Sequence, residues 1–284
     1  MKRHKPFIIT VLLKVATFTR LLLSLRYNVS MKGTEVLKDT MPILILPNHQ
    51  ALIDPIILMS QIYRYSLAIP VISSTFYDIP LLRSIFSEWG AIRVSNLEAG
   101  SRNINVLNEI TQSVQKAFSH GRSVVLYPSG QLTSQGYEKI FNKKSAQKIV
   151  AEMPDDVKVV GVRISGLWGS VWSKAGTGKT PNFFIQLLKG TFYIFANFIF
   201  FLPRREVTIE FEDLTLQTHA NAPLGIKLFN SVLEDYYNFH GEENPNFLRH
   251  FFYLDKKESA HSENSIYYKD SKTLPIARKY EKNK

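Results

Sequence analysis

Short apolar runs alternate with longer amphipathic segments through the middle of this chain. The runs are continuous, as in parallel strands buried on both faces, and they occupy residues 41–47, 67–73, 122–130 and 157–166. Segments with helical periodicity lie between them, at residues 54–65, 81–90 and 99–121. A last run, EVTIEFED (206–213), alternates like a half-exposed strand. This order predicts an α/β fold, in which helices flank a mainly parallel mixed sheet.

The first 27 residues open with a basic cluster, MKRHK, and continue as an apolar segment crossed by one polar line. At helical spacing this line runs through Thr10, Lys14, Thr17, Arg20 and Ser24. The two cations interrupt the apolar run and no small-residue cleavage site follows, which argues against a secretory signal peptide. The pattern favours a membrane-associated amphipathic helix whose cations lie near anionic headgroups. A helix packed on the protein's own core is the alternative.

A second apolar block, NFFIQLLKGTFYIFANFIFFLPRRE, covers residues 182–206. Its length would allow it to cross a bilayer, but Lys189 near its middle argues against a simple span. We favour a helix that lies in the membrane interface or lines a groove, with the basic residues of PRR placed for headgroup phosphates. A buried core helix is the alternative.

Charge and cysteine content narrow the function classes. The chain has 35 Lys and Arg against 24 Asp and Glu, and the net charge of +11 favours anionic partners. Nucleic acid is not expected, because the cations are scattered or terminal and the aromatics lie within apolar blocks. The absence of cysteine excludes disulfides and thiolate zinc sites, and it suits the cytoplasmic face of the inner or plasma membrane.

The predicted organisation has three parts. Residues 1–27 form the membrane-associated helix and residues 28–250 form one domain. Residues 251–284 are rich in charge and lack periodicity, so they are expected to form a flexible tail.

The stretch LPNHQALIDP (46–55) places His49 five residues before Asp54 at a predicted strand-to-helix junction. A neutral imidazole can take a proton from a hydroxyl, and a nearby carboxylate can orient the ring and stabilise the imidazolium. Asp54 also fits the N-cap of the following helix, with Pro55 in its first turn. On spacing alone, a loop histidine followed by a capping aspartate is the simpler interpretation.

NHQALID resembles the H-x-x-x-x-D motif of the glycerolipid acyltransferases, the lysophosphatidic acid acyltransferase-like superfamily. WGAIRVSN stands where that family has G-x-x-x-x-x-R, and YPSGQL stands where it has F-P-E-G-T-R after a strand. VKVVGVRISG resembles the next strand block. RISGLWGSVWSKAGTGKTP, PRREV and GEENPNFLRHFF look like the acyltransferase part of the 2-acylglycerophosphoethanolamine acyltransferase/acyl-carrier-protein synthetase proteins. The resemblance covers about residues 28–250.

The resemblance implies transfer of a fatty acyl group to the hydroxyl of a lysophospholipid or related lyso-lipid. His49 would be the general base and Asp54 its orienting carboxylate. Backbone donors around Tyr127 to Gln131, helped by Gly130, would stabilise the oxyanion. The implied co-substrate is acyl-carrier protein or acyl-coenzyme A, with no metal and no bound cofactor. Membrane lipids are the expected partners, and an acyl-thioester ligase is a further candidate.

Several family positions differ here. Ser129 stands where the family has glutamate, and Gln131 and Leu132 stand where it has threonine and arginine. The expected arginine of the second block falls near Asn96, while Arg93 lies three residues earlier. In the family these positions organise the acceptor's phosphate, so the acceptor here is instead expected to be a zwitterionic lysophospholipid or a phosphate-free lyso amino-acid lipid.

The predicted substrate-binding residues come from these blocks. They are Asn48, Arg93, Tyr127, Ser129, Gly130, Gln131 and Arg163. Further candidate cations for a headgroup or for the thioester donor are Lys139, Lys143 and Lys144.

The sequence offers two other interpretations. SKAGTGKT ends like a phosphate-binding P-loop, but Ser173 stands where its first glycine belongs and Pro181 follows at once, which favours a surface loop. A catalytically degenerate lipid-binding protein of the same fold is the second alternative, suggested by the weakened third block. Retention of both His49 and Asp54 argues for an enzyme, because a binding protein has no need of a general base.

Overall fold

The computed structural model describes residues 6–38, 41–95, 104–198, 201 and 203–248. Its centre is a seven-stranded sheet in the order β1-β7-β6-β2-β5-β3-β4. The strands are β1 (Tyr27–Lys32), β2 (Ile43–Pro47), β3 (Ala68–Ser73), β4 (Ile92–Val94), β5 (Ser123–Val125), β6 (Lys158–Ser165) and β7 (Arg205–Asp213). Neighbouring strands pair in parallel except β6 and β7, which are antiparallel. The predicted mainly parallel mixed sheet is therefore confirmed.

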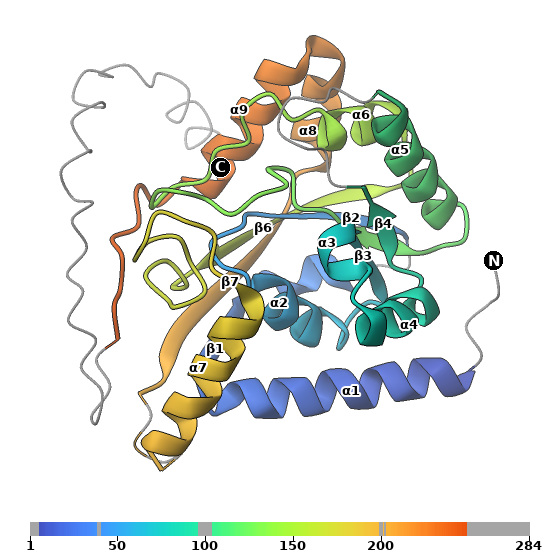
Figure 1. Ribbon diagram of the computed structural model, residues 1–284. Helices are drawn as coiled ribbons and strands as arrows, with labels where there is room; N and C mark the ends of the chain where they lie inside the picture. The colour runs from blue at the N-terminus through green and yellow to red at the C-terminus, as the bar shows by residue number, and fades with distance from the viewer. Residues whose placement is uncertain (1–5, 39–40, 96–103, 199–200, 202, 249–284) are drawn as a thin grey trace, which may run out of the picture.

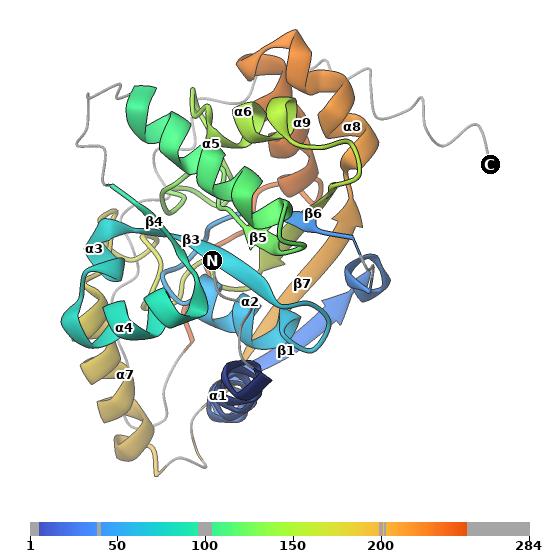
Figure 2. The ribbon, with the colours of Figure 1, turned by 90° about the vertical axis from the view of Figure 1, so that its right-hand side faces the viewer.

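Helices cover both faces of this sheet (Figures 1 and 2). They are α1 (Pro6–Ser24), α2 (Asp54–Ile62), α3 (Ser74–Tyr77), α4 (Pro80–Trp89), α5 (Ile104–Phe118), α6 (Ser145–Glu152), α7 (Phe183–Ala196), α8 (Thr215–Asn221) and α9 (Ile226–Tyr237), with 3-10 turns η1 (Thr34–Leu37) and η2 (Ala222–Leu224). In Figure 1, α5, α6, α8 and α9 lie above the sheet, and α1, α2 and α4 lie below it.

The central strand β2 explains why the core has two halves. Successive side chains of a strand point to opposite faces. Leu44 and Leu46 pack into the apolar cluster under α5, α6 and α9, whereas Ile43 and Ile45 pack into the cluster on the side of α1 and α2. All four side chains are fully buried, and each contributes about 1.5–3 kcal/mol through removal from water. A strand buried on both faces must be apolar throughout, as this one is.

Some local expectations need correction. Asp54 is the first residue of α2 and not its N-cap, a position taken by Ile53. The strand β1 was not predicted, because its sequence YNVSMK mixes polar and apolar residues at the edge of the sheet. The helix predicted over 99–121 corresponds to α5, which ends at Phe118. Residues 96–103 lie outside the described residues. The predicted tail over 251–284 also lies outside the described residues.

Two apolar helices lie at the surface with little cover. In α1 only Ala16 is buried among the described side chains, and exposed residues include Val15, Phe18 and Leu21. No described side chain of α7 is buried, and it exposes residues such as Leu188 and Phe195. A buried core helix within 182–206 is therefore wrong. Among the described helices, none combines the length and the apolar character needed to cross a bilayer.

Candidate active site

The carboxyl ends of three neighbouring strands enclose a cavity of about 2050 Å³. His49 follows β2, the turn from Tyr127 to Leu132 follows β5, and Phe76 follows β3; side chains from each of these segments line the cavity. Open parallel sheets bind ligands at this edge, because the loops that follow the strands converge there. The cavity is therefore the principal candidate for a substrate site.

His49 and Asp54 meet at the entrance to α2. His49 Nδ1 lies 3.1 Å from Asp54 Oδ2. The same carboxylate oxygen accepts the backbone N–H groups of Gln50 at 2.6 Å and of Ala51 at 2.9 Å. Because Oδ2 is an acceptor, Nδ1 carries the proton in the neutral ring, and Nε2 is left with a lone pair that can accept a proton.

The Asp54 carboxylate is costly to bury. The residue is fully buried, and its Oδ1 has no hydrogen-bond partner within the described structure. Burial raises the pKa of Asp54, while hydrogen bonds from His49 and from the two backbone N–H groups oppose that rise. A buried carboxylate with one oxygen lacking a hydrogen-bond partner is tolerated only where the surrounding structure holds it in place. Such groups cluster at functional sites. The geometry is that of a carboxylate which orients a histidine.

The ring of Tyr127 lies against the His49 imidazole. The two ring centroids are 4.5 Å apart and the planes are tilted by 41°. The Tyr127 hydroxyl is buried without a hydrogen-bond partner among the described residues, and burial raises the pKa of this hydroxyl well above its usual range. Tyr127 therefore forms an apolar wall that fixes the plane of the histidine ring beside the cavity.

The turn after β5 presents Gly130 and Gln131 to the cavity. Gly130 has φ +59 and donates its N–H to the Tyr127 carbonyl at 3.1 Å. A Cβ at Gly130 would meet no atom within 4 Å, so glycine is favoured here by its backbone conformation and not by lack of space. The buried Ser129 hydroxyl donates to the Gln131 carbonyl at 2.9 Å and stabilises the same turn.

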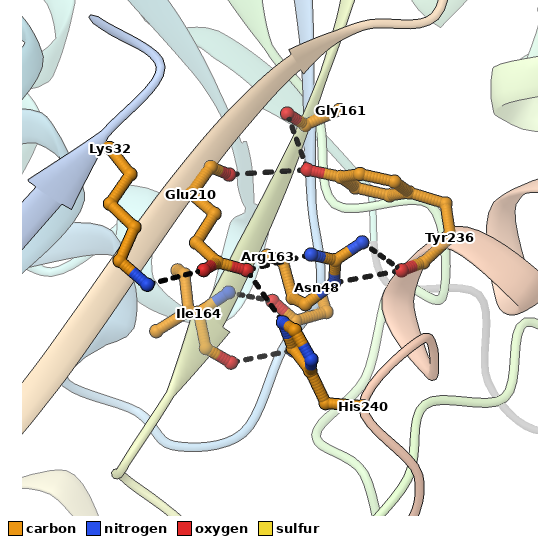
Figure 3. A network of polar contacts seen from close by, with 8 residues as sticks. All are labelled: Lys32, Asn48, Gly161, Arg163, Ile164, Glu210, Tyr236 and His240. Atoms are coloured by element: carbon orange, nitrogen blue, oxygen red, sulfur yellow. Dashed lines mark hydrogen bonds and ion pairs between the residues drawn. The ribbon is translucent and has the colours of Figure 1, made fainter. Parts of the chain in front are cut away.

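Asn48 and Arg163 belong to a network of polar contacts within the protein (Figure 3). Asn48 donates its side-chain amide to the Ile164 carbonyl at 2.9 Å and accepts the Ile164 N–H at 2.7 Å. These bonds tie the loop after β2 to β6. Both residues line a smaller polar pocket of about 400 Å³, and neither lines the large cavity.

Arg163 is held within a charged network. Its guanidinium contacts Glu210 at 2.7 Å, donates to the Tyr236 carbonyl and lies 4.3 Å from the centre of the Tyr236 ring. Lys32 and His240 also bind Glu210. Partial burial acts to raise the pKa of Glu210, but the hydrogen bonds from Lys32, Arg163 and His240 outweigh it and lower the pKa to about 2. The contacts give Arg163 a structural role.

Arg93 is also placed away from the cavity. Its guanidinium binds Asp78 at 2.5 Å in an ion pair whose side chains are both exposed by more than two fifths. The expected family arginine near Asn96 lies outside the described residues. Other cations do reach the cavity, and they are Lys143, Lys144 and Lys227, with Glu88 as the acidic residue on its lining. Of these, Lys227 was missed by the sequence analysis.

Glu138 is the other residue that the sequence analysis missed. Its Oε2 accepts the backbone N–H of His49 at 2.9 Å. No motif marked it, because it lies in a loop without periodicity, 89 residues from its partner. Among the described residues, no group of three or more His, Asp or Glu is arranged to hold a metal ion.

Known proteins share this architecture. Residues 28–165 match the family model described as Acyltransferase. The crystal structure of the 1-acyl-sn-glycerophosphate (LPA) acyltransferase, PlsC, from Thermotoga maritima has a similar fold, with 16% identity, a TM-score of 0.55, and coverage of 84% of this chain and 82% of that chain. No curated protein sequence matches the chain. Residues 28–165 therefore match an acyltransferase family model, and the fold of the chain is shared with a solved acyltransferase.

Proposed function

We propose that this protein is an O-acyltransferase that moves a fatty acyl group from an acyl thioester to the hydroxyl of a lysolipid. The observation that carries the proposal is the His49–Asp54 pair, with His49 lining a large cavity whose walls are mostly apolar. A lipid substrate needs such walls, and a hydroxyl nucleophile needs a base.

His49 Nε2 removes the proton from the acceptor hydroxyl, and the oxygen attacks the carbonyl carbon of the thioester. Asp54 holds the Nδ1 proton and stabilises the imidazolium that forms. The tetrahedral intermediate collapses, the C–S bond breaks, and His49 returns its proton to the leaving sulfur. We assign the oxyanion to backbone N–H groups of the Tyr127–Gln131 turn other than that of Gly130, which is bonded to Tyr127.

The lining of the cavity offers apolar and cationic side chains for different parts of the substrates. Apolar side chains such as Ile56, Met59 and Val71 are proposed to hold acyl chains. The cations Lys143, Lys144 and Lys227 are proposed to bind a phosphate of the donor, since acyl-coenzyme A and the phosphopantetheine arm of acyl-carrier protein both carry phosphate. Leu132, which replaces the family arginine and also lines the cavity, favours an acceptor with a zwitterionic or phosphate-free headgroup.

The domain is proposed to extend beyond the matched residues, over 28–250. The strand β7 pairs with both β6 and β1, so residues 205–213 complete the same sheet. Lys227 of α9 also lines the cavity. A separate acyl-thioester ligase is the partner we propose to supply the donor, as the branch that joins an acyltransferase to an acyl-carrier-protein synthetase implies.

The helices α1 and α7 are proposed to dock the enzyme on the cytoplasmic face of a membrane. Both lie on the same side of the molecule (Figures 1 and 2). The segments that follow the two helices are in contact, because the Arg26 guanidinium donates a hydrogen bond to the Pro203 carbonyl. The sequence has no acidic residue before Glu35 and none between Asp156 and Glu206. An apolar surface with cations and no acids fits an anionic bilayer.

The cavity reaches this surface, because Val11, Val15 and Phe183 are among its lining residues. A lysolipid is therefore proposed to enter from the bilayer. Flotation with vesicles that contain anionic lipid tests the docking. The double variant Leu188→Glu/Phe192→Glu on α7 should lose flotation, whereas Leu216→Glu on α8, also exposed, should not. Equal flotation of all three proteins would contradict the assignment.

Purified protein in detergent tests the reaction. Acyl-carrier protein and acyl-coenzyme A, each carrying a labelled acyl chain, are offered with phosphate-bearing and phosphate-free lysolipids. We expect a diacyl product with at least one pair and none from His49→Ala. Lipid binding without product from any pair would instead favour the degenerate binding protein, which the replacement of the family glutamate by Ser129 also suggests.

A further inference from the structure

Glu138 is a buried carboxylate that the proposed mechanism does not use. It lies in the loop between β5 and α6, and the residue is only 3% exposed. Its Oε2 accepts the His49 N–H at 2.9 Å, while its Oε1 has no hydrogen-bond partner in the described part of the chain. A half-satisfied carboxylate destabilises a protein interior. Its presence therefore calls for a functional explanation.

The backbone that carries Glu138 is fixed independently of His49. Asn238, which ends α9, accepts the Glu138 N–H at 2.8 Å and donates to the Glu138 carbonyl at 3.0 Å. Two residues further on, Ile140 donates its N–H to Glu234 Oε1 at 2.7 Å. Side chains of α9 thus hold both sides of the loop, and they place the Glu138 carboxylate on a rigid support.

Both backbone polar groups of His49 are hydrogen-bonded to this loop. Its N–H donates to Glu138, and its carbonyl accepts the Thr133 N–H at 2.8 Å. The imidazole is held separately, by Asp54 at Nδ1 and by the Tyr127 ring. A change at Glu138 therefore releases the backbone of His49 without removing any contact of its ring.

We propose that Glu138 is a positioning residue, whose carboxylate holds the His49 peptide and so directs the imidazole toward the cavity. Glu138 lines the small polar pocket and not the large cavity, so it acts through His49. Burial raises the pKa of Glu138 to about 8, and the His49 N–H and the Ser129 hydroxyl oppose the rise. Ser129, at the family's glutamate position, thus lies beside a carboxylate supplied from elsewhere in the loop. The inference rests on the proposed acyl transfer.

Kinetics with a productive donor and acceptor pair test the role. In Glu138→Ala the kcat should fall by about 10-fold to 100-fold through misplacement of the base, with KM unchanged for both substrates. Glu138→Gln keeps an oxygen that can accept the His49 N–H, and it should retain most of the kcat. The control is Glu210→Gln, which changes a carboxylate on β7 that is bonded to Lys32, Arg163 and His240, and it should keep the wild-type kcat. A wild-type kcat in Glu138→Ala, or an equal loss in Glu210→Gln, would overturn the proposal.

A second readout does not depend on turnover. The NMR signal of the His49 backbone amide can be assigned by its loss in His49→Ala. In Glu138→Ala this signal should move upfield and its hydrogen should exchange faster, whereas Glu210→Gln should change neither. An unmoved amide signal would overturn the positioning role. A moved signal in a protein whose wild type transfers no acyl group would support the contact and refute the acyl transfer.

Discussion

The polar groups around Glu210 and those around His49 differ in how completely they are hydrogen-bonded. On the β6 side, Glu210 is bonded to Lys32, Arg163 and His240, and the Arg163 guanidinium is also bonded to Tyr236. Around His49, by contrast, the oxygens Asp54 Oδ1 and Tyr127 Oη are buried with no hydrogen-bond partner among the described residues. Charge alone is therefore a poor guide to the reactive side of this molecule.

The difference has a physical meaning. A network in which every charge is paired stabilises one arrangement and has little left to offer a substrate. A histidine with one nitrogen bound to a carboxylate and the other at an apolar cavity can still exchange a proton. The predicted substrate cations Arg93 and Arg163 are held in ion pairs, whereas His49 keeps one ring nitrogen for a substrate.

The largest expected effect comes from Asp54→Asn. The kcat should fall by about 10²-fold to 10⁴-fold, because the amide cannot stabilise an imidazolium. The folded pKa of Asp54 is raised, so the ionised carboxylate costs stability as the pH rises through that pKa. The variant should accordingly unfold at the same temperature as the wild type, or higher, at neutral pH. Steady-state kinetics and thermal unfolding check both parts; a variant that keeps a tenth of the wild-type kcat would contradict the assigned role.

The next effect concerns the cavity walls. Val71→Phe adds volume to a residue of β3 that lines the cavity. Transfer of long acyl chains should drop by about 10-fold relative to short ones, because each methylene in an apolar pocket counts. Competition between donors of two chain lengths measures the ratio. Val171→Phe, an exposed substitution outside the cavity lining, is the control. An unchanged ratio in Val71→Phe would show that the acyl chain does not bind against Val71 in this cavity.

Glu210→Gln should affect stability and leave turnover unchanged. The pKa of Glu210 is about 2 in the folded protein against an ordinary value of 4.5. Its ionised form therefore stabilises the fold fully above about pH 4.5, and this contribution is lost as the pH falls toward 2. The variant should melt about 2–4 °C below the wild type at pH 7, and the two melting curves should converge near pH 2. A fall in kcat would place this network in the reaction.

Arg93→Ala should have the smallest effect. The Arg93–Asp78 pair is exposed, and water screens it. Melting temperature should match the wild type, and KM for donor and acceptor should stay within about twofold. A clear rise in KM for a phosphate-bearing substrate would restore Arg93 as the headgroup ligand that its place in the sequence indicates.

The sequence predicted those features that depend on neighbours along the chain. Buried strands such as β2 were visible as continuous apolar runs, and the resemblance of NHQALID to a known motif, rather than its spacing alone, indicated that His49 and Asp54 act together. Features that depend on distant segments were missed. Nothing near Arg163 in the sequence shows that its partner is Glu210, 47 residues away, and nothing near Glu138 points to His49.

One measurement tests most directly whether His49 is a general base. The acceptor hydroxyl is replaced by a thiol, which has an ordinary pKa of about 8.5, and transfer is followed at pH 9 with wild type, His49→Ala and no enzyme. A thiolate needs no base, so His49→Ala should be inactive toward the hydroxyl acceptor yet transfer to the thiol acceptor at close to the wild-type rate. Equal loss with both acceptors, down to the rate without enzyme, would contradict proton removal as the function of His49.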